Sequence, residues 1–206
     1  MKHRDIKPPQ EKGASSDIIK TIHLKSSGQA KEHFKIVKKR LLNVSDWHNV
    51  SKNPSARFIL TNSKGEEVFR DAKKGDMFKI KIPAPGPAAG DGFDWVKIHS
   101  IKNEIDKDTD SEFLAMIVKP AKNPRGDTIS PAHFFDDKAS STFIVNRTGK
   151  TISAEVHGRN ENPNVKQTGI TDTIRNAVVA LGAMLGFSKI QWEGLAKGLV
   201  SEDERE

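Results

Sequence analysis

The sequence contains no cysteine, and this absence removes several classes of chemistry. A chain without thiols forms no disulfide, no thiolate metal site and no cysteine nucleophile. The first ten residues are charged and contain two prolines, so they lack the apolar stretch of a secretory signal. The longest apolar run, residues 177–187, includes two glycines and is too short to cross a bilayer. We therefore expect a cytoplasmic protein with no transmembrane segment.

Sequence motifs for the common enzyme reactions are missing too. There is no Gly-x-Ser-x-Gly elbow, and the glycine-rich stretch at residues 86–92 lacks the Lys-Ser/Thr pair of a Walker phosphate loop. No two carboxylates stand out as an acid–base pair. The metal-competent side chains fit no zinc or calcium spacing. They are His133, Asp136, Asp137, Glu155 and His157. We interpret them as surface polar groups, and we expect no metal and no cofactor.

Positive charge is concentrated in the first part of the chain. Residues 1–81 hold 19 Lys and Arg and 9 Asp and Glu, a net charge of +10, whereas residues 82–206 carry −3. A basic half of this kind attracts nucleic acid or anionic lipid. Here the basic residues alternate with acids and lack the aromatic spacing of a stacking platform. This pattern favours a solvated surface over a nucleic-acid site.

Apolar periodicity predicts an order of elements that begins with a strand over residues 17–25. Ser26 and Ser27 then suit the start of a helix. Its stripe has the spacing of a helix face and comprises Ala30, Phe34, Val37, Leu41 and Val44. A short helix over residues 47–50 follows. The period then changes to two, which predicts strands over residues 57–61, 77–82, 94–101, 112–119, 141–146 and 151–157.

A closing helix is predicted from Thr171 or Asp172, with a stripe of Ile174, Val178, Leu181 and Leu185 and a last segment that carries Ile190, Leu195 and Leu199. Because the strands are joined by turns and loops, their sheet must be antiparallel. The closing helix must bury its stripe on the concave face of that sheet. The sequence thus predicts an α+β fold, with a curved antiparallel sheet of about seven strands wrapped on a long C-terminal helix.

This domain is expected to span residues 17–200, between a disordered tail at residues 1–16 and a charged tail at residues 201–206. Its order of elements, together with the segment Leu41-Leu42-Asn43-Val44-Ser45-Asp46-Trp47-His48, resembles the START-like helix-grip superfamily, also called SRPBCC. The resemblance implies a cavity between the sheet and the C-terminal helix. Members commonly hold a small apolar or amphipathic ligand there, and a few are enzymes with polar residues in the same cavity.

Two groups of residues are the candidates for ligand contact. The large apolar candidates are Trp47, Trp95, Phe113, Met116, Phe143 and Met184, for which core packing is the alternative role. The polar candidates are Arg159 and Asn160, in the dense polar cluster at residues 157–162. An arginine there suits a carboxylate or phosphate. If Ile152, Ala154 and Val156 pack inward, alternation turns His157 away from the cavity.

Three functions remain open at this point. The first is a noncatalytic binding protein for a small hydrophobic or amphipathic molecule. The second is a cyclase- or hydrolase-type enzyme that uses polar cavity residues. A histidine or carboxylate that faces the cavity with a displaced pKa is the feature that would favour this enzyme. The third is a nucleic-acid or protein-interaction module that uses the basic N-terminal half.

Overall fold

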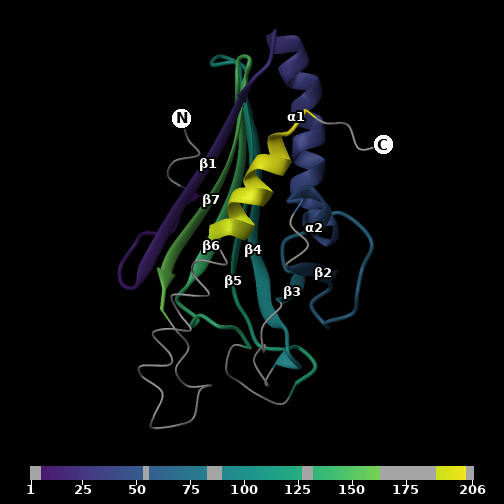
Figure 1. Ribbon diagram of the computed structural model, residues 1–206, viewed down its shortest axis with the longest axis vertical. Coiled ribbons are helices and arrows are strands. Elements are labelled where there is room, and N and C mark those ends of the chain that lie inside the picture. The colour runs from purple at the N-terminus through teal and green to yellow at the C-terminus, as the bar shows by residue number, and fades with distance from the viewer. Residues whose placement is uncertain (1–5, 53–55, 83–89, 127–131, 163–188, 203–206) are drawn as a thin grey trace.

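The computed structural model of the protein describes residues 6–52, 56–82, 90–126, 132–162 and 189–202. One sheet dominates it, and helices lie against one face of that sheet (Figure 1). The start of the predicted closing helix, with Met184, lies outside the described residues. Residues 189–200 are helical and are called the C-terminal helix below.

Helix α1 (Ser27–Leu42) has the predicted stripe and the predicted cap. The hydroxyl of Ser26 accepts a hydrogen bond from the backbone N–H of Gln29 at 3.2 Å, which satisfies one of the free N–H groups of the first turn. The buried positions are spaced by four, three and four residues and are Ala30, Phe34, Val37 and Leu41. A 3-10 turn, η2 (Val44–Asp46), and helix α2 (Trp47–Val50) follow and bury Trp47 completely.

The sheet has seven strands, all paired antiparallel, in the order β1-β7-β6-β5-β4-β3-β2. They are β1 (Ala14–His23), β2 (Arg57–Thr61), β3 (Met77–Lys81), β4 (Asp94–Asp106), β5 (Ser111–Pro120), β6 (Ser140–Thr148) and β7 (Thr151–Glu161). Strand β5, which buries apolar residues on both faces, is the central strand. The predicted fold class is confirmed.

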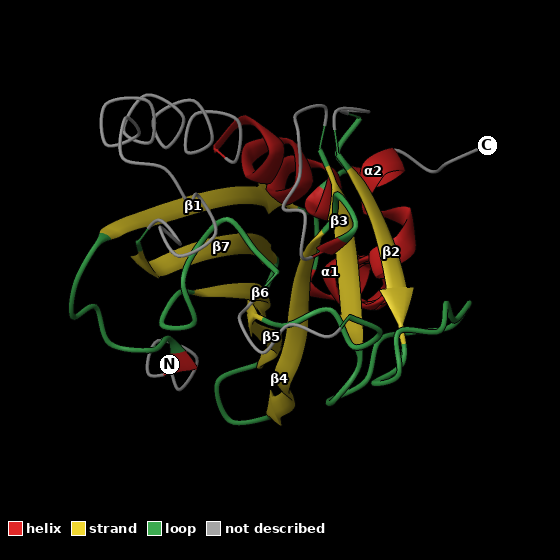
Figure 2. Ribbon diagram, turned by 90° about the horizontal axis from the view of Figure 1, so that it is seen from below, coloured by secondary structure: helices red, strands yellow, loops and turns green. Residues whose placement is uncertain are grey.

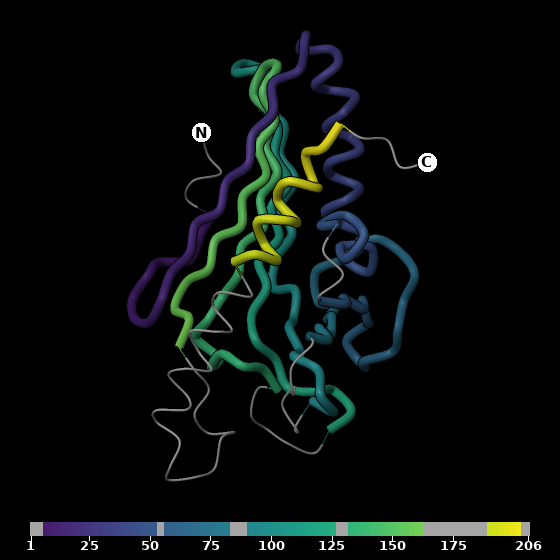
Figure 3. The backbone as a smooth tube through the Cα atoms, in the orientation of Figure 1, coloured from purple at the N-terminus to yellow at the C-terminus, as the bar shows by residue number. Residues whose placement is uncertain are grey.

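The sheet is curved, and the helices lie on its concave side (Figure 2). Even-numbered residues of β5 and β7, among them Met116 and Val156, join the main core there with α1 and the C-terminal helix. The C-terminal helix runs beside α1 (Figure 3), where the Arg40 guanidinium donates hydrogen bonds to the carbonyl oxygens of Gly198 and Leu199, both at 3.2 Å. Burial of its Leu195 and Leu199 therefore anchors this helix to the core.

The N-terminal segment is ordered before the predicted boundary at residue 17. Strand β1 begins at Ala14, three residues earlier than the predicted strand, and pairs with β7. Residues 9–12 of the expected disordered tail contact one side chain of β7. The amide of Asn160 accepts from the backbone N–H groups of Glu11 at 2.7 Å and Lys12 at 3.2 Å, and it donates to the carbonyl oxygen of Pro9 at 3.1 Å. These long-range contacts, invisible in the local composition, order the segment.

A β-bulge interrupts the pairing of β7 with β1. Ser16 pairs with Gly158 but Ala14 pairs with Glu161, so β7 holds one extra residue between these two pairs. Asn160 lies in this bulge with φ of 55°, a left-handed conformation that asparagine tolerates better than most residues. An extra residue reverses the alternation of faces beyond it. The bulge therefore places Glu161 on the concave face, whereas strict alternation from His157 would have placed it on the convex face.

Candidate functional site

A cavity of about 70 Å³ lies between the sheet and the C-terminal helix. Its walls are aromatic and come from four elements. Phe58 lies on β2, Phe78 on β3, Phe143 on β6 and Trp192 on the C-terminal helix. An apolar cavity of roughly 150 Å³ is known to accept benzene. The cavity as it stands therefore accommodates a small group, and a larger ligand requires its walls to move.

Trp47 holds these aromatic walls in place from behind. Its ring lies 4.8 Å from the ring of Phe143 and 6.5 Å from the ring of Trp192, measured between centroids. Its indole N–H donates to the carbonyl oxygens of Arg40 and Leu41, both at 3.2 Å. Tilted and edge-to-face aromatic contacts of this kind add to the free energy of burial. The aromatic wall is thus a fixed surface built around one buried tryptophan.

One part of the cavity lining is polar and includes Asp94 and His133. The Asp94 carboxylate accepts a hydrogen bond from the backbone N–H of Phe134 at 2.8 Å, and the backbone N–H of Phe135 donates to Nδ1 of His133 at 2.9 Å. Burial lowers the pKa of His133, and the nearby charge of Asp94 opposes this effect. Since Nδ1 accepts a hydrogen bond, the neutral imidazole carries its proton on Nε2.

Glu161 is the second acidic group of the lining. Only 6% of it is exposed, and within the described part of the chain its carboxylate accepts no hydrogen bond. The carboxylate lies over Gly158: a Cβ atom built on this glycine would be 2.3 Å from Oε1 of Glu161. Burial raises the pKa of Glu161 to about 7, and the positive charge of Arg159 only partly opposes the shift. A proton at this carboxyl is therefore exchanged near neutral pH.

Of the predicted apolar contacts, Phe143 lines the cavity, while Trp47 and Met116 lie in the core behind the lining. Trp95 and Phe113, also predicted as ligand contacts, lie outside the cavity lining. They belong to separate clusters on the convex face, with Met77 and Ala132 for Trp95 and with Ala115 and Ile144 for Phe113. Their strands are apolar on both faces, so alternation alone did not reveal which face is concave. Met184 is outside the described residues.

The predicted polar contacts face the N-terminal segment rather than the cavity. The Arg159 guanidinium donates to the Asp17 carboxylate at 2.6 Å and to the carbonyl oxygen of Ser16 at 3.0 Å. His157, which was expected to face away from the cavity, is buried between the carboxylates of Asp17 and Glu155. These convex-face contacts join β1 to β7. Of residues 157–162, Glu161 lines the cavity, whereas the predicted contacts Arg159 and Asn160 are not in its lining.

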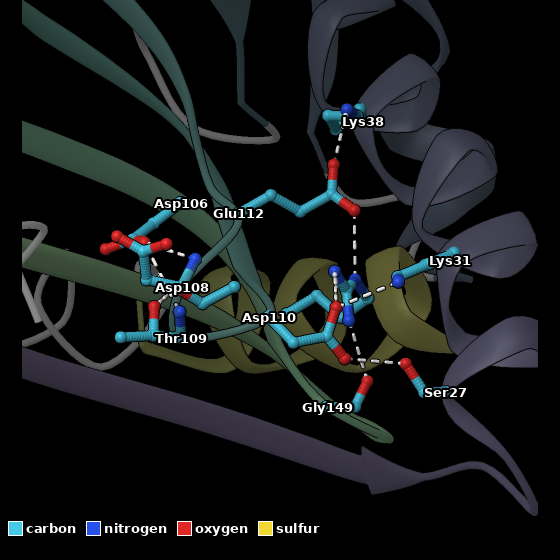
Figure 4. A network of polar contacts seen from close by, with 11 residues as sticks. Ser27, Lys31, Lys38, Asp106, Asp108, Thr109, Asp110, Glu112 and Gly149 are labelled. Atoms are coloured by element: carbon cyan, nitrogen blue, oxygen red, sulfur yellow. Dashed lines mark hydrogen bonds and ion pairs between the residues drawn. The ribbon is translucent and has the colours of Figure 1, made fainter.

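Charged groups at the far end of the sheet form a second polar network, drawn in Figure 4. The Arg147 guanidinium donates to Glu112 at 2.9 Å, to Asp110 at 3.2 Å and to the carbonyl oxygen of Gly149 at 2.8 Å. Lys31 of α1 pairs with Asp110 at 2.9 Å, and Lys38 with Glu112 at 2.9 Å. The network ties α1 to two hairpins, and it neutralises part of the basic charge of the N-terminal half.

Neighbouring acids at this end do not make a metal site. Asp106, Asp108 and Asp110 alternate along the chain, but the Asp106 carboxylate accepts from the backbone N–H groups of Asp108 at 3.1 Å and Thr109 at 3.3 Å (Figure 4). Across the described ranges, no three His, Asp or Glu side chains are arranged to hold a metal ion. Among the helices described, none is long and apolar enough to cross a membrane.

Comparisons with known proteins return likenesses at low identity. No sequence family and no curated protein matches the chain. Ara h 8.0201 is 11% identical with a TM-score of 0.33, covering 91% of this chain and 100% of its own. Norcoclaurine synthase from Thalictrum flavum is 11% identical with a TM-score of 0.35, covering 93% of this chain and 90% of its own. Major latex-like protein 151 from Panax ginseng is 14% identical with a TM-score of 0.31, covering 89% of this chain and 99% of its own. These proteins belong to the START-like superfamily. Likenesses of this size concern fold alone.

Proposed function

We propose that the protein binds a small hydrophobic or amphipathic molecule in the cavity between its sheet and its C-terminal helix. The observation that supports this function is the composition of the cavity: four aromatic walls with a few polar groups at one part of the lining. Binding sites for small molecules have this composition, because apolar walls supply affinity and a few polar atoms supply orientation. The polar groups are Asp94, His133, Ser141, Glu161 and Gln191.

The test combines a search for a retained ligand with a defined probe. Protein purified under native conditions is analysed by native mass spectrometry and by solvent extraction. Benzyl alcohol, a neutral amphipathic probe, is then titrated and followed by ligand-observed NMR. Ser141→Leu, on the cavity-facing side of β6, fills the cavity and is expected to weaken probe binding at least tenfold. Phe69→Ala removes an aromatic that is 93% exposed and is the matched control.

Two results would overturn this function. The first is a protein that carries no extractable molecule and does not bind the probe. The second is probe binding that Ser141→Leu and wild type share equally, because it would place the probe elsewhere. Circular dichroism and thermal unfolding of both variants show whether each is folded.

A second function, acid–base catalysis in the same cavity, is favoured by one specific observation. Glu161 and His133 both line the cavity, and burial displaces the pKa of each toward its neutral form. A carboxyl with a pKa near 7 exchanges a proton at the pH of the cell, which is what a general acid or base requires. The test is conversion of an extracted ligand by the purified protein, followed by mass spectrometry. Glu161→Gln is expected to stop conversion while binding continues.

A further inference from the structure

The buried carboxyl of Glu161 identifies the chemistry of the ligand, on the premise that the proposed cavity is a binding site. We propose that the cavity takes a small apolar molecule that carries a protonated amine, and that the Glu161 carboxylate is the partner of this amine. Three features of the cavity support the assignment: the missing partner of the carboxyl, the sign of the surrounding charge and the aromatic walls.

The first feature is the burial of Glu161 in the cavity lining. Burial of a carboxylate is costly unless it is paired or hydrogen-bonded. Glu161 is 6% exposed and accepts no hydrogen bond from any described residue. The bulge at Asn160 nevertheless turns this side chain to the concave face, and glycine at position 158 leaves room for its carboxyl. The fold thus places in an aromatic cavity an acid that no described residue hydrogen-bonds, at a cost in stability, and a cationic ligand would be a partner for it.

The second feature is the sign of the charge around the carboxyl. Asp94 from β4 adds another acid to the lining, and His133 is held in its neutral form by burial. Arg159 of β7 is the cation that acts on the pKa of Glu161, but its guanidinium is bound to Asp17 on the convex side. The Ser16 hydroxyl of β1, which lies beside the same space over Gly158, is uncharged. The cavity therefore attracts a cation and repels an anion.

The third feature is the aromatic wall formed by Phe58, Phe78, Phe143 and Trp192. The faces of aromatic rings attract cations, most strongly where water is excluded. The volume of about 70 Å³ holds an ammonium group, and an apolar body as large as a benzyl group requires the walls to move. The aromatic rings thus solvate both parts of such a molecule.

Three probes of similar shape but different charge test the assignment: benzylamine, benzyl alcohol and benzoate. Their dissociation constants are measured by ligand-observed NMR at pH 8. Benzylamine is expected to bind roughly tenfold more tightly than benzyl alcohol, since a hydrogen bond between charged groups exceeds one between neutral groups by about this factor. Benzoate is expected not to bind. Equal binding of amine and alcohol would overturn the amine assignment and leave the cavity's binding function standing, whereas failure of all three probes would overturn both.

Two variants separate the carboxylate from the rest of the cavity. Glu161→Gln removes the charge at constant shape, and Gly158→Ala displaces the carboxyl, because its Cβ would lie 2.3 Å from Oε1 of Glu161. Both are expected to abolish the preference for benzylamine and to leave the affinity for benzyl alcohol unchanged. Glu155→Gln, on the convex face of the same strand, is the matched control and should keep the preference. A preference that survives Glu161→Gln would refute the proposal.

The pH dependence supplies an independent readout. With a pKa of about 7, Glu161 is roughly one-tenth ionised at pH 6 and nine-tenths ionised at pH 8. An alkyl amine stays protonated over this range. Benzylamine binding should therefore tighten about tenfold from pH 6 to pH 8, whereas benzyl alcohol binding should stay constant. A benzylamine affinity that does not change with pH would contradict the role of Glu161.

Discussion

Gly198 sets how closely the C-terminal helix approaches α2, and its replacement by alanine tests whether this approach positions the cavity wall. A Cβ atom at Gly198 would lie 1.7 Å from the carbonyl oxygen of Val50, where ordinary contact begins at 3.4 Å. One turn earlier, a Cβ atom at Gly194 would lie 2.9 Å from the carbonyl oxygen of Ser51. Both neighbours are backbone atoms that cannot rotate away. Gly198→Ala must therefore push the helix outward, and Trp192 moves with it.

The expected cost follows from two opposing effects. Overpacking costs typically 1–3 kcal/mol, and a clash between two backbones belongs at about 3 kcal/mol. Alanine in place of glycine inside a helix stabilises the fold by about 1 kcal/mol through its higher helix propensity. The net loss is about 2 kcal/mol in the free energy of unfolding. For a chain of this size, such a loss lowers the melting temperature by about 5 °C.

Urea unfolding followed by circular dichroism measures the loss, and tryptophan fluorescence reports the displacement of Trp192. Gly28→Ala is the matched control, because its Cβ would meet only the Ser26 hydroxyl at 3.8 Å. This control should be as stable as wild type or slightly more stable. A Gly198→Ala protein as stable as the Gly28→Ala protein would refute the argument that backbone contact fixes the position of the C-terminal helix.

Three further changes test the charged groups. Arg147→Met should lower the free energy of unfolding by about 2 kcal/mol, since it leaves Lys38 as the one remaining cation on Glu112 among the described residues, in a site where the arginine side chain is 3% exposed. Lys35→Met, in an exposed pair, should cost less than about 0.5 kcal/mol. Burial raises the pKa of Glu112, but hydrogen bonds from Arg147 and Lys38 outweigh this effect and lower it overall. The stabilisation from these bonds is therefore present above the unfolded-state pKa of Glu112 and is lost on acidification. In urea unfolding between pH 3 and pH 7, Arg147→Met should lose less stability with falling pH than wild type does. The pKa of Glu161 is raised, so ionisation of this carboxyl destabilises the fold as pH rises from about 4.5 to 7. Glu161→Gln should therefore raise the free energy of unfolding by on the order of 2 kcal/mol at pH 8 and change it little at pH 4. A Glu161→Gln protein no more stable than wild type at pH 8 would contradict the burial of this carboxyl.

The elements with one polar and one apolar face were predictable from the sequence. The α1 stripe from Ala30 to Leu41 was confirmed because α1 presents a single buried face. In β3, Phe78 and Ile80 join the main core, although Met77 is buried on the opposite face. Strand β4 extends five residues past its predicted end, to Asp106. Its side chains are exposed and, apart from Ile105, polar, so it has no apolar alternation to detect. Pairing with β5 extends the strand instead.

The assignment of faces in the central strand was beyond a local argument. Phe113 and Met116 differ in parity, and both are buried. Hydrophobicity alone gives no preference between the two faces of such a strand. Only the position of the helices makes one face concave, and that position depends on contacts far apart in the sequence. Of the two side chains, Met116 lies on the helix side and Phe113 lies beside Ile6 of the N-terminal segment.

The orientation of Glu161 shows how a distant contact decides a local feature. In the sequence, residues 157–162 form one polar cluster with no sign of which side chain turns inward. The extra residue in β7 separates them: Arg159 stays on the convex side, and Glu161 turns to the cavity. Asn160 occupies the bulge, and residues 9–12, some 150 positions away, hold its side chain. The N-terminal segment therefore stabilises the β-bulge at Asn160, which turns an acidic side chain into a cavity with aromatic walls. A local conflict that distant contacts maintain is typical of a functional site rather than of a packing error, and this is the physical reason for assigning the ligand's partner to Glu161.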